Sequence, residues 1–268
     1  MPLEDISSII IENLQTSISG KLLSDLAESG ISLFTCNDKH TPNGVLAPFM
    51  CHSRQLAVAR LQLEISEPFK KRLWKSLVVG KILNQARCLD LAEKEGAKTL
   101  RSVSESVLSG DSDNREAYAA KLYFEFLFGN QFKRGDEDCI NAYLNYGYAI
   151  YRGIIARHLS SHGLIPCFGI FHRSTQNPFN LADDLIEPFR PIIDLYVATK
   201  MSGSELTPDK KRELVSTLNL LTRVKKQLLA VEFAVIKTVQ SFVRACEKKD
   251  YDLIELPELV ALNHKAEE

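Results

Sequence analysis

The hydrophobic positions along this chain change their period near residue 50. In the first fifty residues, two short apolar runs at 6–11 and 31–36 flank a segment at 17–29 with apolar residues at helical spacing. Runs of β-branched residues favour strands, whereas a spacing of three to four favours an amphipathic helix. Gly30 follows the helical segment, in the place where glycine commonly ends a helix. The pattern predicts a β-α-β unit, followed by a turn-rich segment at 37–44.

From residue 51 onward the apolar spacing is helical. Residues 139–162 are mostly apolar and predict one long helix, whose four tyrosines we expect in the core. The loop at 110–114 can cap a helix that begins near Arg115. Residues 209–248 predict one or two further helices.

The predicted fold class is therefore mainly α, with two unequal domains. A small N-terminal β-rich domain, a β-α-β remnant, covers residues 1–50, and a larger α-helical domain covers residues 51–268. Two strands and one helix bury too little apolar surface to be stable alone. We expect the N-terminal unit to be incomplete, or to lean on the rest of the chain or on a partner.

Composition narrows the class of protein. Hydrophobic residues make up 45% and charged residues 25%, which is typical of a globular protein. No apolar run approaches the roughly 20 residues that span a bilayer, and the chain begins without a basic, secretory-type segment. Six cysteines occur without a C-x-x-C pair, which leaves a structural zinc site of that spacing unsupported. We expect a cytoplasmic protein with no membrane association and with reduced thiols.

The net charge is −1, but basic residues are unevenly distributed. Residues 60–101 hold ten Lys or Arg against five Asp or Glu, and residues 209–249 hold ten against four. Clustered basic residues can form a phosphate-binding stripe even in a neutral protein. The alternative is that they are the solvated faces of amphipathic helices, and the charge pattern alone favours this alternative.

A histidine followed by acids is the clearest candidate for chemistry. His172 follows the apolar run 168–171, and Asp183, Asp184 and Glu187 follow it on a predicted helical turn. Asn180 could be the N-cap of that helix, with Asp183 as its capping-box partner. Carboxylates that share a helix face repel unless a cation lies between them, and an imidazole with carboxylates suits a divalent metal. Asp183 is more simply explained as a partner of the helix N-terminus, an explanation that fits Glu187 less well.

Glu116 is a further acid that could belong to the same site. It opens the helix predicted near Arg115, on a face with Ala119 and Ala120, whose small side chains would let another element approach closely. An acid in the first turn can also serve only the helix dipole, and the spacing alone leaves both readings open.

These segments together resemble one known family, the CRISPR-associated adaptation integrases, and most closely the branch from type II systems. The similarity runs from about Leu3 to the C-terminal helices. The resembling segments are residues 114–116, 119–121, 123–124, 145–150, 169–172 and 177–191.

The resemblance implies a metal-dependent DNA endonuclease and strand transferase that inserts spacers into the CRISPR array. It implies that Glu116, His172 and Glu187 hold Mg²⁺ or Mn²⁺ and are the catalytic residues, with Asp183 or Asp184 as the nearby acid that some members use. It also implies a small β domain joined to an α-helical catalytic domain, a homodimer, a second small adaptation protein, and double-stranded or branched DNA as substrate. On this basis Arg115, Arg173 and residues 70–72 become candidates for phosphate contacts, with plain surface solvation as the alternative.

One departure from the family concerns the start of the chain. The family has additional β-strands before the segment that matches residues 2–12, and they are absent from this sequence. This indicates either a start codon placed too late or a truncated protein. Since those strands help the family's protomers to pair, the alternative function is a catalytically impaired DNA-binding or assembly subunit. A phosphohydrolase of small nucleotides is a remoter alternative and would need a deep pocket.

Overall fold

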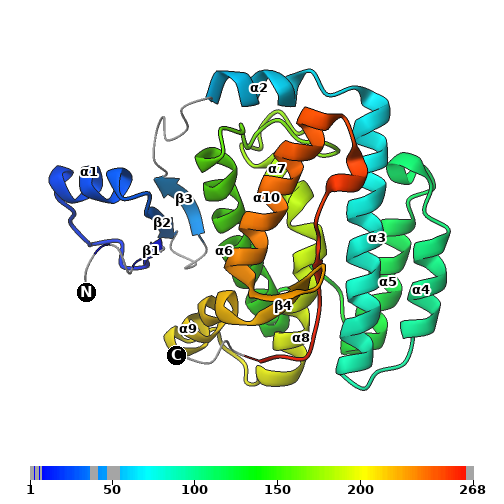
Figure 1. Ribbon diagram of the computed structural model, residues 1–268. Coiled ribbons are helices and arrows are strands. Elements are labelled where there is room, and N and C mark those ends of the chain that lie inside the picture. The colour runs from blue at the N-terminus through cyan, green and yellow to red at the C-terminus, as the bar shows by residue number, and fades with distance from the viewer. Residues whose placement is uncertain (1–2, 4–5, 7, 37–41, 47–54, 264–268) are drawn as a thin grey trace.

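The computed structural model describes residues 3, 6, 8–36, 42–46 and 55–263. Most of this chain is helical, and Figure 1 shows a bundle of helices with a smaller unit at its side that holds the N-terminal strands. The predicted fold class, mainly α with a small β portion, is confirmed. In the described part of the chain, no helix combines the length and the apolar character needed to span a membrane.

The N-terminal sheet has three strands where the sequence predicted two. Strands β1 (Ser8–Ile11) and β2 (Ser32–Cys36) run parallel and are connected by helix α1 (Gly20–Glu28), which confirms the β-α-β unit. Strand β3 (Pro42–Leu46) lies antiparallel on the other edge of β2 and overlaps the end of the segment at 37–44 that was expected to be turns. A Cβ atom on Gly44 would lie 2.6 Å from the hydroxyl of Thr35, so glycine is needed where these strands pair closely.

Two long helices form the centre of the helical body. Helices α3 (Glu67–Leu91) and α6 (Cys139–Ser161) bury residues on all sides, and the four tyrosines of α6 are at most 7% exposed, as predicted. The surrounding helices are α2 (Gln55–Leu63), α4 (Ala97–Glu105), α5 (Arg115–Phe128), α7 (Asn180–Leu185), α8 (Arg190–Lys200), α9 (Pro208–Ser216) and α10 (Val231–Lys248). Short 3₁₀ turns are η2 (Ser109–Asp111), η3 (Glu187–Phe189), η4 (Thr217–Asn219) and η5 (Tyr251–Leu253).

A second small sheet interrupts the region that was predicted as one or two helices. Strands β4 (Leu221–Val224) and β5 (Gln227–Ala230) form a hairpin between α9 and α10, and β6 (Pro257–Glu258) pairs with the other edge of β4. The turn carries Lys225 at a φ of 55°, a left-handed conformation that glycine or asparagine usually marks. The prediction of one or two helices is confirmed by α9 and α10, but it missed the hairpin between them because the turn has no such residue.

The N-terminal unit packs against the helical body, which was one of the alternatives expected from the sequence. Phe34 of β2 belongs to the main core, and its ring fills the space that a side chain at Gly153 of α6 would occupy. Glu12 accepts a hydrogen bond of 3.1 Å from the Tyr146 hydroxyl and pairs with Lys211 at 3.2 Å. The predicted domain boundary at residue 50 lies outside the described residues and stays a prediction.

The cysteines that the structure describes are unpaired. Cys36, Cys88 and Cys246 are buried, while Cys139 and Cys167 are partly or fully exposed. This agrees with the expectation of reduced thiols, and the sixth cysteine, Cys51, lies outside the described residues.

Candidate functional site

Glu116 lies in the first turn of α5, as its sequence position suggested. The expected loop cap is present, but its capping group is Asp111. The Asp111 carboxylate accepts hydrogen bonds from the backbone N–H groups of Arg115 at 2.8 Å and Glu116 at 3.1 Å. Asn114 occupies the N-cap position with a φ of 54° and makes no side-chain cap. The α5 N-terminus is therefore already capped by Asp111, and the Glu116 side chain is turned to a different partner.

Glu187 begins the turn η3 and is buried, with 6% of the residue exposed. Its Oε1 atom accepts a 3.0 Å hydrogen bond from Nε of Arg190. The turn is anchored from α3, because Nδ2 of Asn84 donates to the carbonyl of Pro188 at 2.7 Å. Burial by itself raises the pKa of Glu187, but the charges of Arg190 and Lys81 outweigh it and bring the pKa to about 2. Glu187 is thus held as a carboxylate across the physiological range.

Lys81, from the middle of α3, lies between the two glutamates. Its ammonium group bonds to Oε1 of Glu116 and lies 2.5 Å from Oε2 of Glu187. Only 7% of Lys81 is exposed. Among the described residues of α3, Lys81 is the one that forms an ion pair with each of the two glutamates. Sequence analysis missed this residue because it counted Lys81 with the basic residues of a solvated helix face.

His172 is held by one of the two candidate assisting acids. Its Nδ1 atom lies 2.7 Å from Oδ1 of Asp184, which is completely buried. Asp184 also accepts bonds from the backbone N–H groups of residues 170–172. A Cβ atom on Gly169 would lie 2.3 Å from the His172 carbonyl oxygen, so the tight loop requires glycine there. The hydrogen bond to Asp184, opposed in part by burial, raises the pKa of His172.

Asp183 faces a different neighbour. Its Oδ2 atom accepts bonds of 2.6 Å from Arg152 and from Asn177. The expected N-cap at Asn180 is wrong, because Phe179 takes that position and the Asn180 side chain bonds to residues 167 and 174. Asp183 is therefore not a capping-box partner, and among the described residues its side chain bonds to Arg152 and Asn177 and not to His172. The loop before α7 is tied together by the Asn180 amide.

The structure brings Glu116 and Glu187 together and places His172 close enough for its charge to affect Glu187. In the part of the chain described, no three His, Cys, Asp or Glu side chains are close enough to hold a metal as they stand. Two features nevertheless suit a divalent ion. A cation already lies between the two carboxylates, and the buried Oε2 of Glu187 meets no hydrogen-bond donor in proper geometry among the described residues. The chemistry of the set, two carboxylates and an imidazole anchored by an acid, fits Mg²⁺ or Mn²⁺.

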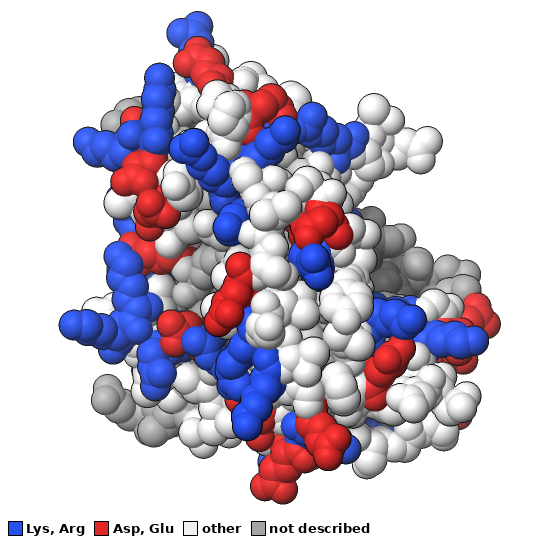
Figure 2. Space-filling model, turned by 90° about the vertical axis from the view of Figure 1, so that its right-hand side faces the viewer, with Lys and Arg blue, Asp and Glu red and all other residues white. Residues whose placement is uncertain are grey.

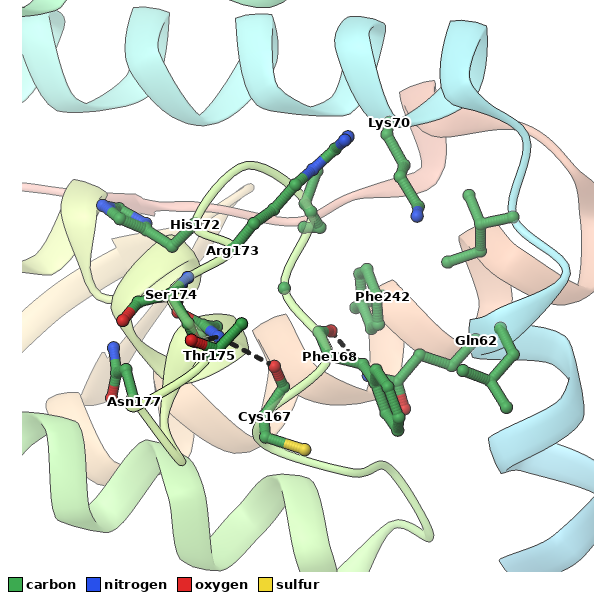
Figure 3. Close-up of a pocket in the computed structure, with 15 residues that line it drawn as sticks. Gln62, Lys70, Cys167, Phe168, His172, Arg173, Ser174, Thr175, Asn177 and Phe242 are labelled. Atoms are coloured by element: carbon green, nitrogen blue, oxygen red, sulfur yellow. Dashed lines mark hydrogen bonds between the residues drawn. The ribbon is translucent and has the colours of Figure 1, made fainter.

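An open cavity of about 480 Å³ adjoins His172. Figure 3 shows Lys70 reaching into it from α3 and Arg173 extending from the loop after His172, with Phe168 and Gln62 on the far wall. Gln62 donates to the carbonyls of Ile165 and Phe168 and thereby fixes that wall. The cavity offers cationic and amide groups beside the imidazole, a lining suited to an anionic chain.

The basic residues that were candidates for phosphate contacts have mixed surroundings. Arg173 and Lys70 both pair with Glu67, at 2.6 and 3.4 Å, and Arg115 pairs with Asp113 at 2.5 Å. On the face that Figure 2 shows, Lys and Arg side chains lie interspersed with Asp and Glu. The surface is therefore a mixture of both charges there, and the exposed pairs are weak enough to exchange partners.

Comparison with known proteins identifies relatives over most of the chain. A model of the family "CRISPR associated protein Cas1" matches residues 1–232. The CRISPR-associated endonuclease Cas1 of Neisseria meningitidis serogroup C is 46% identical over 267 residues, which cover 98% of this chain and 88% of that protein.

Solved structures share the fold at lower identity. A casposase bound to integration product superposes with a TM-score of 0.77 at 20% identity and covers 91% of this chain and 79% of that one. A chain of a Cas6-RT-Cas1–Cas2 complex gives 0.74 at 16% identity and covers 95% of this chain and 32% of that one. With a family model over most of its length and a relative at 46% identity, this chain belongs to the Cas1 family of CRISPR-associated proteins.

Proposed function

We propose that this chain is a CRISPR adaptation integrase, an endonuclease and strand transferase that joins spacer DNA into the CRISPR array. The observation that carries the proposal is that Glu116 of α5 and Glu187 of η3 both pair with the buried ammonium group of Lys81. His172 lies close enough for its charge to affect Glu187. Membership of the Cas1 family and the endonuclease name of the Neisseria relative support the reaction class. Because the relative at 46% identity is named an endonuclease and aligns with 98% of this chain, the alternative of a catalytically impaired assembly subunit is not favoured.

In this proposal, Glu116, His172 and Glu187 hold a single Mg²⁺ or Mn²⁺. When bound there, such a metal would supply Lewis-acid polarisation of a phosphodiester and would offset the charge that develops as a 3′-hydroxyl or water displaces the leaving oxygen. Asp184 keeps Nδ1 of His172 protonated, which leaves Nε2 as the ligand atom. Arg190 keeps Glu187 ionised and in place. Asp184 is thus the assisting acid through His172, and Asp183 belongs to the rim.

The substrate in this proposal is double-stranded or branched DNA, bound mainly through its phosphates. The cavity beside His172, with Lys70 and Arg173, is the part of the surface that adjoins the reacting residues. Binding should therefore weaken as salt concentration rises. The fold shared with a chain of a Cas6-RT-Cas1–Cas2 complex supports a second, small adaptation protein as partner. We further propose a homodimer, working on the array in the cytoplasm.

Strand transfer on branched DNA with Mn²⁺ tests the ligand set. Glu116→Gln, His172→Ala and Glu187→Gln should each abolish joining while leaving a folded protein by circular dichroism. Glu125→Gln, a change of the same kind on the same helix at a more exposed position, should leave joining intact. Full activity of any one of the first three variants would remove that residue from the ligand set.

A further inference from the structure

Lys81 is the one described residue that forms ion pairs with both candidate metal-ligand glutamates. The two acids belong to separate elements, and the α3 backbone between them is fixed by packing against α4, α5, α8 and η3. The side chain of Lys81 is 9% exposed, whereas the side chain of Glu116 is 27% exposed. The contact is therefore closed on the Glu187 side and open toward solvent on the Glu116 side.

The Lys81 ammonium group lies between two carboxylates, Oε1 of Glu116 on one side and Oε2 of Glu187 on the other. The local charges then balance, because Lys81 and Arg190 offset Glu116 and Glu187. A divalent ion added to this balanced set would lie within a few ångströms of an ammonium group, and two cations at that separation repel strongly.

We propose that Lys81 is a built-in counter-cation that holds Glu116 and Glu187 together before metal binds and leaves its place between them when metal binds. The inference rests on the proposed function, since it assumes that these two glutamates are metal ligands. Lysine suits the role because its charge is compact and its four-carbon stem is flexible, so the head can move while α3 stays in place. An arginine in this position would be held by a rigid planar fork and would yield less readily.

Two opposite consequences follow from this role. Without metal, Lys81 stabilises the protein, since its removal leaves two carboxylates facing each other with Arg190 as the remaining cation near Glu187. With metal, Lys81 competes, so its removal strengthens metal binding. A residue that merely supported the fold would lower stability and metal affinity together, which separates the two explanations.

The experiment measures Mn²⁺ binding by electron paramagnetic resonance and unfolding temperature with and without Mn²⁺. Lys81→Met should unfold at a lower temperature without metal and bind Mn²⁺ about tenfold more tightly or better. Mn²⁺ should raise its unfolding temperature more than it raises that of the wild type. Lys81→Arg should keep metal-free stability and bind Mn²⁺ more weakly. Lys75→Met, an exposed change on the same helix, is the matched control and should match the wild type in both measurements.

Weaker Mn²⁺ binding by Lys81→Met, with the wild type binding normally, would overturn the counter-cation role and leave the proposed metal site standing. If Lys81→Met does not fold, Lys81→Gln replaces it, because glutamine keeps a hydrogen-bond donor without the charge, and the same tighter binding is expected. Absence of Mn²⁺ binding by the wild type would overturn both the counter-cation role and the metal centre.

Discussion

Asp184 accepts a hydrogen bond from the ring of His172 at 2.7 Å and from the backbone N–H of the same residue at 3.1 Å. A single buried carboxylate thus fixes both the path of the loop and the orientation of the imidazole. Asp183, its neighbour in sequence, points to Arg152 on α6 instead. Adjacent acids on one short helix consequently have different partners, the His172 loop for Asp184 and Arg152 with Asn177 for Asp183.

Asp184→Asn should destabilise the protein by about 3 kcal/mol, because an amide leaves at least one of the buried N–H donors of residues 170–172 without an acceptor. It should also lower metal affinity by about 10- to 100-fold, since the imidazole loses its orienting partner. Denaturant unfolding and Mn²⁺ titration measure the two effects. Asp183→Asn is the matched control and should cost about 1 kcal/mol or less, because its partner Arg152 is partly exposed. An equal loss in both variants would contradict the division of tasks.

Glu187→Gln should be far more costly to stability than Glu116→Gln. The change at Glu187 leaves Lys81 and Arg190 facing a neutral group in a buried setting, which costs about 3–5 kcal/mol. Glu116 is 27% exposed at its side chain, so water can solvate what its loss uncovers, and the cost should be under about 2 kcal/mol. Urea unfolding without metal checks the difference. Equal costs would show that the two acids share one environment.

The long elements of this fold were predictable because their signal is local. The spacing of apolar residues predicted the end of α6 to within one residue. The loop before Arg115 correctly indicated where α5 begins. The β4–β5 hairpin was missed because its turn uses Lys225, a residue with no turn preference. Strand β3 was missed because its pairing with β2 is a tertiary contact inside a segment rich in turn residues.

The candidate site was predictable only in part, for a related reason. Residue type and order predicted Glu116, His172 and Glu187 through the family resemblance, and this ligand set stays a prediction, but the sequence could not separate Asp183 from Asp184. Their separation depends on which one meets the tight loop at Gly169. Lys81 carried no local signal, because a lysine among other basic residues on a helix is normally at the surface, and its burial depends on two acids distant in sequence.

A buried carboxylate away from the metal site should give the protein a measurable dependence on pH. Asp194 accepts hydrogen bonds from the hydroxyls of Tyr123 and Tyr148. Burial raises its pKa to about 6, against the lowering effect of those bonds and of Arg190 and Arg134. The other titratable group facing it is the thiol of Cys88.

Because the folded pKa of Asp194 lies above the usual 3.8, its contribution to stability is fully present below about pH 3.8 and is lost as the pH rises through 6. The amide in Asp194→Asn cannot ionise, so the stability of this variant does not fall with pH at this position. The free energy of unfolding of the wild type relative to the variant should therefore fall by up to about 3 kcal/mol between pH 4 and pH 7. Urea unfolding across that range measures it, and parallel profiles for the two proteins would mean that Asp194 is ionised throughout.

The packing of the N-terminal unit against α6 can be tested by substituting one glycine, Gly153. A Cβ atom at Gly153 would lie 2.0 Å from Cε1 of Phe34, so Gly153→Ala forces the ring out of the core. Helix propensity alone would make the same change stabilising by about 1 kcal/mol, so the sign of the effect separates the two. We expect faster hydrogen exchange in β2 and a lower unfolding temperature.

Gly20→Ala, at a helical position with open space around it, should be neutral or stabilising. Adding Phe34→Leu to Gly153→Ala should recover part of the lost stability, because the smaller side chain leaves room for the new methyl group. If docking of the N-terminal unit did not depend on this contact, the double variant would be less stable than Gly153→Ala alone.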